Sequence, residues 1–301
     1  MQIIKLWCRH ASQLIISNFV PRHLPVKFED VNKLQDFLSS SSRLLVITGA
    51  GISTESGIPD YRSEGVGLYV TSQYRPVQYQ EFVKNSSVRR SFWARNYVGW
   101  PRFSNVEPNI VHLALSKWEK AGRLNMLVTQ NVEKLHSKAG SELVTELHGS
   151  AFRVICLTCH NRVLRDDLQT IISSNNTDFT KTTAQIRPDG DVELHQGEIE
   201  NFNVPSCLKC GGILKPDIVF FGENVPMNRV NFVYGKIKEA DKILVLGSSL
   251  QVYSAYRFML AARKENKPIA IVNIGATRAD DLAEVKVNAR CGEVLPKLNL
   301  S

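Results

Sequence analysis

The chain has 301 residues, of which 43% are hydrophobic and 22% are charged. This balance is typical of a globular protein, which can bury a sizeable core as one large domain with a smaller one, or as two medium domains. The longest apolar runs, such as residues 243–246, are far too short to cross a bilayer, so we expect no membrane span. The net charge is +8, but half of it comes from the first 28 residues. The remaining net charge, about +4, gives little support for a nucleic-acid partner, and we expect no nucleic acid to bind.

The N-terminal segment is basic and weakly amphipathic. Residues 1–27 contain Lys5, Arg9, Arg22 and Lys27, and no acidic residue. The segment lacks the long apolar core and the small-residue cleavage site of a secretory signal. We therefore predict that residues 1–27 are a mitochondrial transit peptide and that the protein acts in the mitochondrial matrix. A loose N-terminal tail is the alternative.

Short apolar runs alternate with helical stretches along the chain. Six runs rich in β-branched residues or leucine predict buried strands, at residues 43–48, 126–129, 143–147, 218–221, 243–246 and 269–273. Helices are predicted at residues 28–38, 110–121, 227–240 and 255–266. This alternation is typical of an α/β fold, and we predict a doubly wound, parallel, Rossmann-like sheet that is covered on both faces.

Two segments interrupt the alternation. Residues 64–105 are aromatic-rich and predict a small helical module, in which Trp93, Tyr97 and Trp100 share one helical face. We interpret this face as core rather than as a nucleic-acid surface. Residues 150–216 hold two cysteine pairs and a polar stretch of predicted loops, and they predict a small zinc-binding module. The large part would then comprise about residues 28–63, 106–149 and 217–301.

A glycine-rich turn follows the first predicted strand. The sequence Gly49-Ala-Gly51-Ile-Ser53 would let the backbone approach a pyrophosphate, and the next helix would offer unpaired N–H groups. The third glycine of the dinucleotide fingerprint is absent, so the turn favours a dinucleotide but not hydride transfer. The polar segment beyond it carries Asp60 and Arg62, which we expect to cover the ligand. A tight turn without any ligand is the alternative reading.

Four cysteines form two Cys-x-x-Cys pairs, which are Cys156 with Cys159 and Cys207 with Cys210. Each pair can hold one side of a tetrahedral ion, and four thiolates leave no open coordination position. The pairs therefore predict one structural Zn²⁺ rather than disulfides. Reduced thiols, or a redox pair, are the alternative.

Polar clusters follow five of the predicted strands, where open α/β sheets bind ligands. They are residues 129–133, 147–149, 221–223, 247–249 and 273–275. His148 is the best candidate for a general base, because an unperturbed imidazole titrates near neutrality and this one lies at a strand end before a glycine. We interpret His112, His160 and His195 as surface or core residues without a catalytic role. His136 is an intermediate candidate for a functional role, because it follows the polar cluster at residues 129–133.

These motifs, in this order, resemble those of the sirtuin family. The resemblance extends from about residue 28 to Pro296, and it rests on Gly49–Arg62, Thr129–Asn131, Leu147–Gly149, both cysteine pairs, Lys215–Glu223, Gly247–Ser249 and Val272–Gly275. Three segments are similar to the mitochondrial class II, sirtuin-four branch, namely Trp93–Trp100, Pro188–Val192 and Gly247–Ser254.

The resemblance implies an NAD⁺-dependent protein-lysine deacylase. The acyl oxygen of a modified lysine would attack the ribose carbon that bears nicotinamide, and nicotinamide would leave. His148 would then activate a ribose hydroxyl, and the acyl group would pass to ADP-ribose. Lipoyl, biotinyl or branched acyl groups on mitochondrial metabolic enzymes are the implied substrates. A protein mono-ADP-ribosyltransferase on the same fold is the main alternative, and a nucleotide sensor without chemistry is another.

The resemblance also implies roles for individual residues. His148 and Asn131 would be catalytic. NAD⁺ contacts are implied for Gly49, Ala50, Gly51, Ser53, Thr54, Asp60, Tyr61, Arg62, Tyr69, Gln130, Asn131, Val132, Glu133, Gly247, Ser248, Ser249, Asn273, Ile274, Gly275 and Cys291. Cys291 would offer backbone atoms near adenine rather than a nucleophile. The segments 222–223 and 250–252 would pair with the substrate backbone as added strands. The family usually has Asp at the position of Glu133, so we expect the extra methylene to change nicotinamide affinity and turnover.

Overall fold

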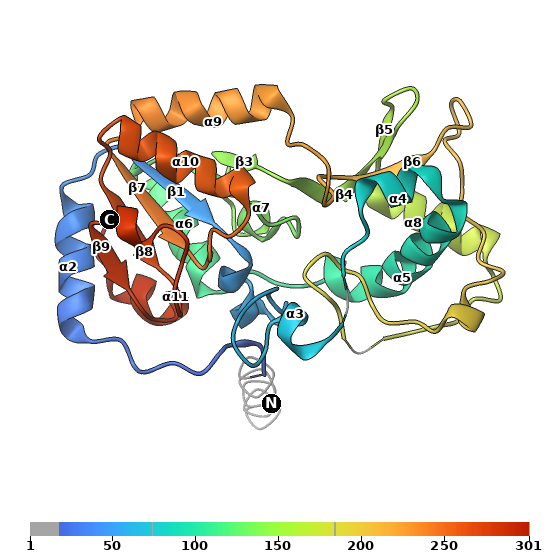
Figure 1. Cartoon of the computed structure of the whole chain (residues 1–301), viewed down its shortest axis with the longest axis horizontal. Coiled ribbons are helices and arrows are strands. Elements are labelled where there is room, and N and C mark those ends of the chain that lie inside the picture. The colour runs from blue at the N-terminus through green and yellow to red at the C-terminus, as the bar shows by residue number, and fades with distance from the viewer. Residues whose placement is uncertain (1–17, 74, 184, 301) are drawn as a thin grey trace.

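The computed structural model describes residues 18–73, 75–183 and 185–300. They form two bodies that lie side by side along the longest axis of the molecule (Figure 1). One body contains a six-stranded sheet and the C-terminus, and the other contains a three-stranded sheet. Most of the predicted transit peptide, residues 1–17, lies outside the described residues.

The large sheet is parallel at every pairing. In order across the sheet, its strands are β3 (Val144–Glu146), β2 (Leu124–Thr129), β1 (Leu44–Thr48), β7 (Lys242–Leu246), β8 (Ile269–Val272) and β9 (Val285–Val287). The chain crosses from β2 and β3 on one side of β1 to β7 on its other side. The predicted doubly wound, parallel sheet is therefore confirmed.

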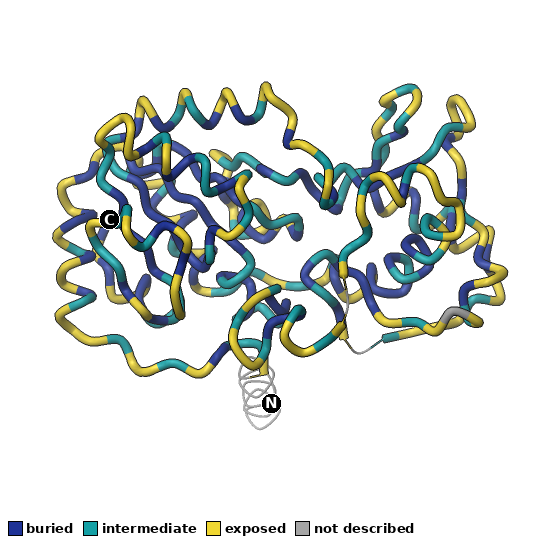
Figure 2. The backbone as a smooth tube through the Cα atoms, viewed as in Figure 1, coloured by how far each residue is buried: buried dark blue, intermediate teal, exposed yellow. Residues whose placement is uncertain are grey.

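Strand β1 shows why the strands are nearly all apolar. Leu44 and Val46 pack into one hydrophobic cluster, and Leu45 and Ile47 pack into another on the opposite face. Alternate side chains of a strand point to opposite faces, so a strand that is covered on both sides must be apolar throughout. Figure 2 shows the strands of this sheet buried, whereas α9 presents alternating buried and exposed residues.

Helices cover both faces of the large sheet. On one face lie α2 (Phe28–Ser39) and α6 (Ile110–Lys120), and on the other lie α9 (Met227–Glu239) and α10 (Tyr253–Lys264). Shorter helical segments join the elements, namely η1 (Ala50–Ile52), η2 (Thr54–Ser56), α3 (Leu68–Thr71), α7 (Leu135–Lys138), η4 (Asp280–Leu282), α11 (Cys291–Val294) and η5 (Leu295–Lys297). The four predicted helices are confirmed, with ends that differ by at most two residues.

The smaller body combines helices with an antiparallel sheet. Its elements are α4 (Tyr79–Lys84), α5 (Ser86–Ser104), β4 (Gly149–Cys156), β5 (Arg162–Leu164), α8 (Arg165–Asn175), η3 (Gln196–Glu198) and β6 (Leu214–Ile218). Trp93 and Trp100 are buried, and the Arg165 guanidinium lies 4.7 Å from the Trp100 ring. The aromatic face of α5 is therefore core, as expected. The exact module boundaries near residues 64, 106, 150 and 217 stay predictions.

One predicted strand is wrong. Residues 218–221 do not join the parallel sheet, because β6 ends at Ile218 and pairs antiparallel with β4 in the smaller body. Phe220 instead packs its ring 5.2 Å from that of Phe82 and 5.3 Å from that of Phe92. This short apolar run therefore forms a packed loop rather than a strand of the large sheet. Periodicity alone cannot distinguish the two.

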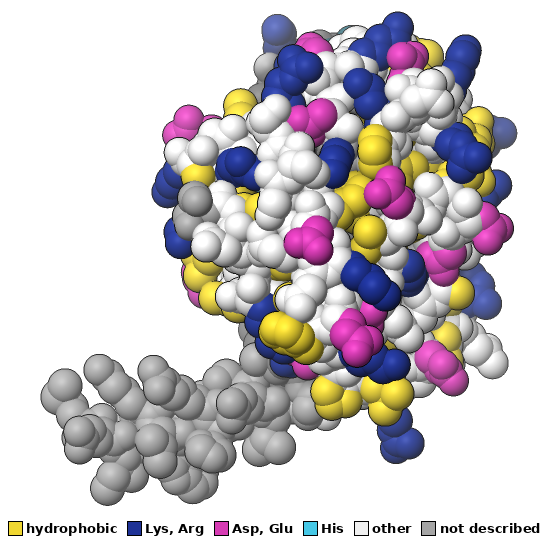
Figure 3. Space-filling model, turned by 90° about the vertical axis from the view of Figure 1, so that its left-hand side faces the viewer, with side chains coloured by type: hydrophobic (Ala, Val, Ile, Leu, Met, Phe, Trp, Pro, Cys, Tyr) yellow, Lys and Arg dark blue, Asp and Glu magenta, His cyan; other side chains and the backbone are white. Residues whose placement is uncertain are grey.

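The outer surface carries charges of both signs. On the face shown in Figure 3, lysine and arginine side chains are interspersed with aspartate and glutamate. Within the described residues, no helix combines the length and the apolar character that a bilayer crossing requires.

Candidate functional site

A cavity of about 660 Å³ is lined by residues of both bodies. The large body contributes the segments that follow β1, β2, β3, β7 and β8, so the cavity lies at the carboxyl ends of the strands. The smaller body contributes residues 188–189 and the segment 218–225. The strand ends at which the sequence predicts a ligand site therefore line this cavity.

The glycine-rich turn is packed against the turn after β7. A Cβ atom on Gly51 would lie 2.8 Å from the Gly247 carbonyl oxygen, so a larger residue would push the two turns apart. The Gly51 N–H donates to that same carbonyl at 2.9 Å. The helix expected after the turn is absent, because the chain forms only the single 3₁₀ turns η1 and η2 there. The expected helix N-terminus is therefore wrong, and the buried and half-buried residues of the turn line the cavity instead.

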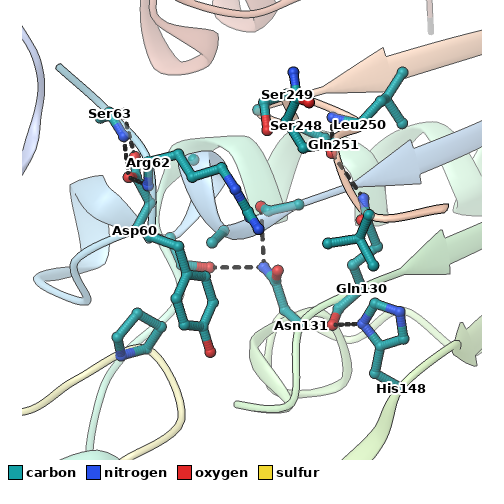
Figure 4. A pocket seen from close by; sticks show the side chains of 18 of the residues that line it. Asp60, Arg62, Ser63, Gln130, Asn131, His148, Ser248, Ser249, Leu250 and Gln251 are labelled. Atoms are coloured by element: carbon teal, nitrogen blue, oxygen red, sulfur yellow. Dashed lines mark hydrogen bonds between the residues drawn. The ribbon is translucent and has the colours of Figure 1, made fainter. Parts of the chain in front are cut away.

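Asp60 organises the segment that follows. Its carboxylate accepts hydrogen bonds from the Arg62 N–H at 3.0 Å and the Ser63 N–H at 2.8 Å. This turn directs the Arg62 side chain across the cavity toward Asn131 (Figure 4). Tyr61 also lines the cavity, whereas Tyr69 does not. The Tyr69 ring packs 5.4 Å from that of Tyr61, and the Arg62 guanidinium lies 5.3 Å from the Tyr69 ring.

A hydrogen-bonded cluster joins the ends of β1, β2 and β7. Gln130 Nε2 donates to Ser248 Oγ at 2.8 Å. Asn131 Nδ2 lies 3.1 Å from the Gly49 carbonyl oxygen and 3.0 Å from Glu133 Oε1. Burial raises the pKa of the Glu133 carboxyl. Because several polar groups hold one another here, the cavity wall is fixed before any ligand binds.

His148 is held at both ring nitrogens. Nδ1 donates to the Gln130 carbonyl oxygen at 2.9 Å, and Nε2 lies 2.8 Å from Ser254 Oγ. Since a carbonyl can only accept, the proton of the neutral ring resides on Nδ1 and the basic lone pair on Nε2. Burial lowers the pKa of His148 to about 4, so the imidazole is neutral at physiological pH and Nε2 carries no proton.

The turn after β8 and the start of α11 form another part of the wall. Asn273, Ile274, Gly275 and Cys291 all line the cavity. The Asn273 side chain lies along its own turn and donates to the Ile274 carbonyl oxygen at 2.8 Å. Burial raises the pKa of the Cys291 thiol to about 12. A thiol that stays protonated is a poor nucleophile, which agrees with a backbone role for Cys291.

The remaining predicted residues also reach the cavity. Ala50, Ser53, Thr54, Val132, Gly247 and Ser249 all line it. Tyr69 is therefore the one predicted NAD⁺ contact that does not line the cavity.

Several cavity residues were missed from sequence. Asp189 lines the cavity because the polar segment 187–192 folds back on α5, where a Cβ atom on Gly99 would collide with the Gly190 carbonyl. Burial raises the pKa of Asp189 to about 6. Pro21 and Arg22 line the cavity as well, although they were assigned to the leader. Composition carries no signal for such contacts, because each depends on how a distant segment folds back.

The four paired cysteines meet in the smaller body. Their Sγ atoms all lie within 4.8 Å of one another, with Cys156 and Cys210 at 3.5 Å and Cys159 and Cys207 at 3.7 Å. These separations are too long for a disulfide, whose sulfurs lie about 2.05 Å apart. Tetrahedral zinc with Zn–S bonds of 2.3 Å places its sulfurs about 3.8 Å apart. The cluster therefore fits one structural zinc ion.

Comparisons with known proteins identify the family. The Sir2 family model matches residues 49–254. The chain is 55% identical to "NAD-dependent protein deacylase Sirt4" of Drosophila melanogaster, over 93% of this chain and 90% of that protein. It is 54% identical to "NAD-dependent protein lipoamidase sirtuin-4, mitochondrial" of Homo sapiens, over 96% and 92%. The chain belongs to the Sir2 family.

Solved structures agree with this assignment. A structure described as "Sir2-p53 peptide-NAD+" matches with a TM-score of 0.71 and 30% identity, over 89% of this chain and 96% of that chain. One described as "Structure of Sir2Tm bound to a propionylated peptide" matches with a TM-score of 0.68 over the same shares.

Proposed function

We propose that this site moves an acyl group from a protein lysine to the ADP-ribose part of NAD⁺ and releases nicotinamide. The protein is an NAD⁺-dependent protein deacylase of the Sir2 family, and its relatives carry deacylase and lipoamidase names. The observation that carries the assignment of residues is the neutral imidazole of His148, which lines the cavity and is held in the tautomer with its lone pair on Nε2. These names favour deacylation over the mono-ADP-ribosyltransferase alternative.

NAD⁺ supplies a ribose carbon that already bears a good leaving group, so the protein must provide position and one base. The turn from Gly49 to Ser53 and the Arg62 guanidinium would bind the pyrophosphate and the adjoining ribose. Asn131 would orient the nicotinamide ribose, since its side chain is fixed by Gly49 and Glu133. Asn273 and the backbone of Cys291 would contact the adenosine end.

His148 would accept the proton of a ribose hydroxyl. The Gln130 carbonyl keeps the ring in the tautomer with its lone pair on Nε2. Positioned acid–base groups of this kind contribute roughly 10²–10⁴-fold to rate. A partly enclosed cavity also keeps water from competing for the acyl group.

The four cysteines would hold a structural zinc ion. A closed set of four thiolates leaves no coordination position for substrate, so zinc would supply folding energy rather than chemistry. The cysteines join β4 to the end of the polar insertion, and Cys156 and Cys207 belong to the core of the smaller body. Loss of zinc would thus loosen the wall that the smaller body contributes.

The substrate would enter between the two bodies. Residues 222–223 and 250–252 line the cavity and would pair with an extended peptide. We propose lipoyl-lysine or related long acyl groups, because the human and bovine relatives are named lipoamidases. The same relatives are named mitochondrial, and we propose matrix enzymes as substrates there.

His148→Ala tests the proposal. Purified protein is incubated with NAD⁺ and acetyl-, lipoyl- and biotinyl-lysine peptides, and acyl-ADP-ribose is measured by mass spectrometry. We expect wild-type product to require both substrates, and His148→Ala to lose at least about 100-fold in rate. His195→Ala, an exposed histidine, is the matched control. Full activity in His148→Ala would refute the assignment of the base, and labelling of the protein by NAD⁺ without peptide would favour ADP-ribosyl transfer.

A further inference from the structure

The basic nitrogen of His148 faces a serine rather than open space. Nε2 lies 2.8 Å from Ser254 Oγ, and both residues line the cavity. Because Nδ1 donates to the Gln130 carbonyl, Nε2 carries the lone pair, and the Ser254 hydroxyl must be the donor of this bond. Ser254 is the second residue of α10, and the residue before this helix, Val252, makes no side-chain cap bond. The Ser254 hydroxyl bonds to the imidazole.

An imidazole nitrogen has a single lone pair in the plane of the ring, and here Ser254 occupies it. A ribose hydroxyl that approaches from the cavity therefore meets the Ser254 oxygen before it meets a free Nε2. That oxygen has donated its own hydrogen and still has two lone pairs that can accept one. The pair is thus arranged as a short chain of hydrogen bonds that ends on the base.

We propose that Ser254 relays the proton from the substrate ribose hydroxyl to His148. The ribose O–H bond breaks, and its proton bonds to Ser254 Oγ. At the same time the Oγ–H bond breaks, and that proton bonds to Nε2. The ribose oxygen keeps the electron pair with which it attacks the acyl carbon, and the π electrons of the bond between that carbon and the lysine nitrogen move onto the nitrogen. His148 becomes the imidazolium, with Nδ1–H still bonded to Gln130.

The surroundings support a fixed relay. Ala255, next to Ser254, is fully buried in the hydrophobic cluster under α10, so the first turn of this helix is anchored. His148 is anchored from the other side, since its carbonyl oxygen accepts from the Val219 N–H at 2.8 Å. Arg229 of α9 donates to the Leu147 carbonyl oxygen at 2.9 Å and is a cation close to the ring. A nearby cation disfavours the imidazolium, as burial also does, so the ring rests neutral with an unprotonated Nε2.

This inference rests on the proposed deacylase function. Two variants of Ser254 with side chains of equal volume, threonine and valine, allow the relay to be tested separately from that function. Ser254→Thr keeps the hydroxyl, whereas Ser254→Val fills the same volume without it, and no water-sized gap is opened. Each variant is assayed with NAD⁺ and a lipoyl-lysine peptide. Two rates are measured, the exchange of labelled nicotinamide into NAD⁺, which precedes the proton transfer, and the formation of acyl-ADP-ribose, which requires it. Ser174→Ala, an exposed helix serine whose hydroxyl bonds only to its own helix, is the control.

We expect Ser254→Val to form acyl-ADP-ribose about 10- to 100-fold more slowly, with nicotinamide exchange within about twofold of wild type. Ser254→Thr should retain most of both rates. Wild-type acyl transfer measured in mixtures of H₂O and D₂O should show two protons in motion, and Ser254→Val should show one. The relay is overturned if Ser254→Val forms acyl-ADP-ribose at the wild-type rate, or if exchange and acyl transfer fall together. An absence of nicotinamide exchange in wild type would instead refute the proposed function itself.

Discussion

Glu133 Oε1 accepts a hydrogen bond from Ser53 Oγ at 2.8 Å, which ties the segment after β2 to the glycine-rich turn after β1. The same oxygen accepts from Asn131 Nδ2 at 3.0 Å. Glu133 is nearly completely buried, with 3% exposure. Its carboxyl group therefore acts as a shared acceptor at the cavity wall.

We predict that Glu133→Ala weakens both the fold and the cofactor site. The buried Ser53 hydroxyl loses its acceptor, which costs about 1–3 kcal/mol for a group left unsatisfied, whereas Asn131 Nδ2 keeps the Gly49 carbonyl oxygen as a partner. The free energy of unfolding should fall by about that amount in a denaturant titration, and the KM for NAD⁺ should rise several-fold. Glu133→Gln keeps an acceptor oxygen, so its free energy of unfolding should fall less and its KM for NAD⁺ should rise less than in Glu133→Ala. Glu239→Ala, at an exposed ion pair on α9, should change neither quantity. Equal NAD⁺ affinity in Glu133→Ala and wild type would show that the wall holds without this carboxylate.

The buried histidines His112 and His136 predict a loss of stability in mild acid. Their rings lie 4.9 Å apart, and burial lowers the pKa of His112 from 6.5 to about 3 and that of His136 well below 6.5. When the pKa of a histidine is lower in the folded protein than in the unfolded chain, its contribution to stability is fully present above the unfolded pKa, near 6.5. This contribution is lost as the pH falls toward the folded pKa, at about 1.4 kcal/mol per pH unit for each histidine.

The measurement is the free energy of unfolding between pH 7.5 and 4.5. His112→Gln removes one titrating group, so its curve should be flatter than that of wild type by about 1.4 kcal/mol per pH unit below pH 6. His195→Gln, at an exposed position, should run parallel to wild type. Parallel curves for His112→Gln and wild type would mean that this ring does not have the depressed pKa.

The cysteine cluster predicts that zinc and stability are lost together. Cys207→Ser should release zinc, as measured with a colorimetric chelator, and should lower the melting temperature, because metal binding contributes folding free energy. Lys209→Ala lies within the same Cys-x-x-Cys turn and is exposed, so it should keep both. A Cys207→Ser protein that is free of zinc but melts like wild type would contradict a structural role for the metal.

Much of the site could be predicted because it is built from short segments at strand ends. The polar residues after β1, β2 and β7 are read directly from the sequence, since parallel strands place their carboxyl ends on one edge of the sheet. Ser254, Asp189 and Arg22 were missed for a common reason. Asp189 and Arg22 reach the cavity through a loop and a terminal segment that are remote in sequence, and Ser254 reaches it from the first turn of α10. Neither periodicity nor residue type records such a contact. The misassigned strand at 218–221 shows the same limit, because its apolar residues pack on the aromatic core of α5.

The segment that precedes α2 predicts where the mature chain can begin. Pro21 is buried, and Pro21 and Arg22 line the cavity. The Val26 N–H donates to Glu293 Oε1 at 3.0 Å, and His23 Nε2 lies 3.6 Å from Glu293 Oε2. A leader that ended at residue 27, as composition suggests, would remove these contacts.

We therefore predict that a protein that begins at residue 18 and one that begins at residue 28 differ in cofactor binding. The shorter protein should bind NAD⁺ several-fold more weakly by calorimetry and should melt at a lower temperature, because it lacks part of the cavity wall and the hydrogen bond from the Val26 N–H, which is worth about 1 kcal/mol. Arg22→Ala in the longer protein should weaken NAD⁺ binding without lowering the melting temperature, since Arg22 is exposed and faces the cavity. Lys27→Ala, exposed and outside the cavity lining, is the matched control. If both truncated proteins bound NAD⁺ equally, residues 18–27 would be dispensable, and cleavage after residue 27 would remain compatible with a working site.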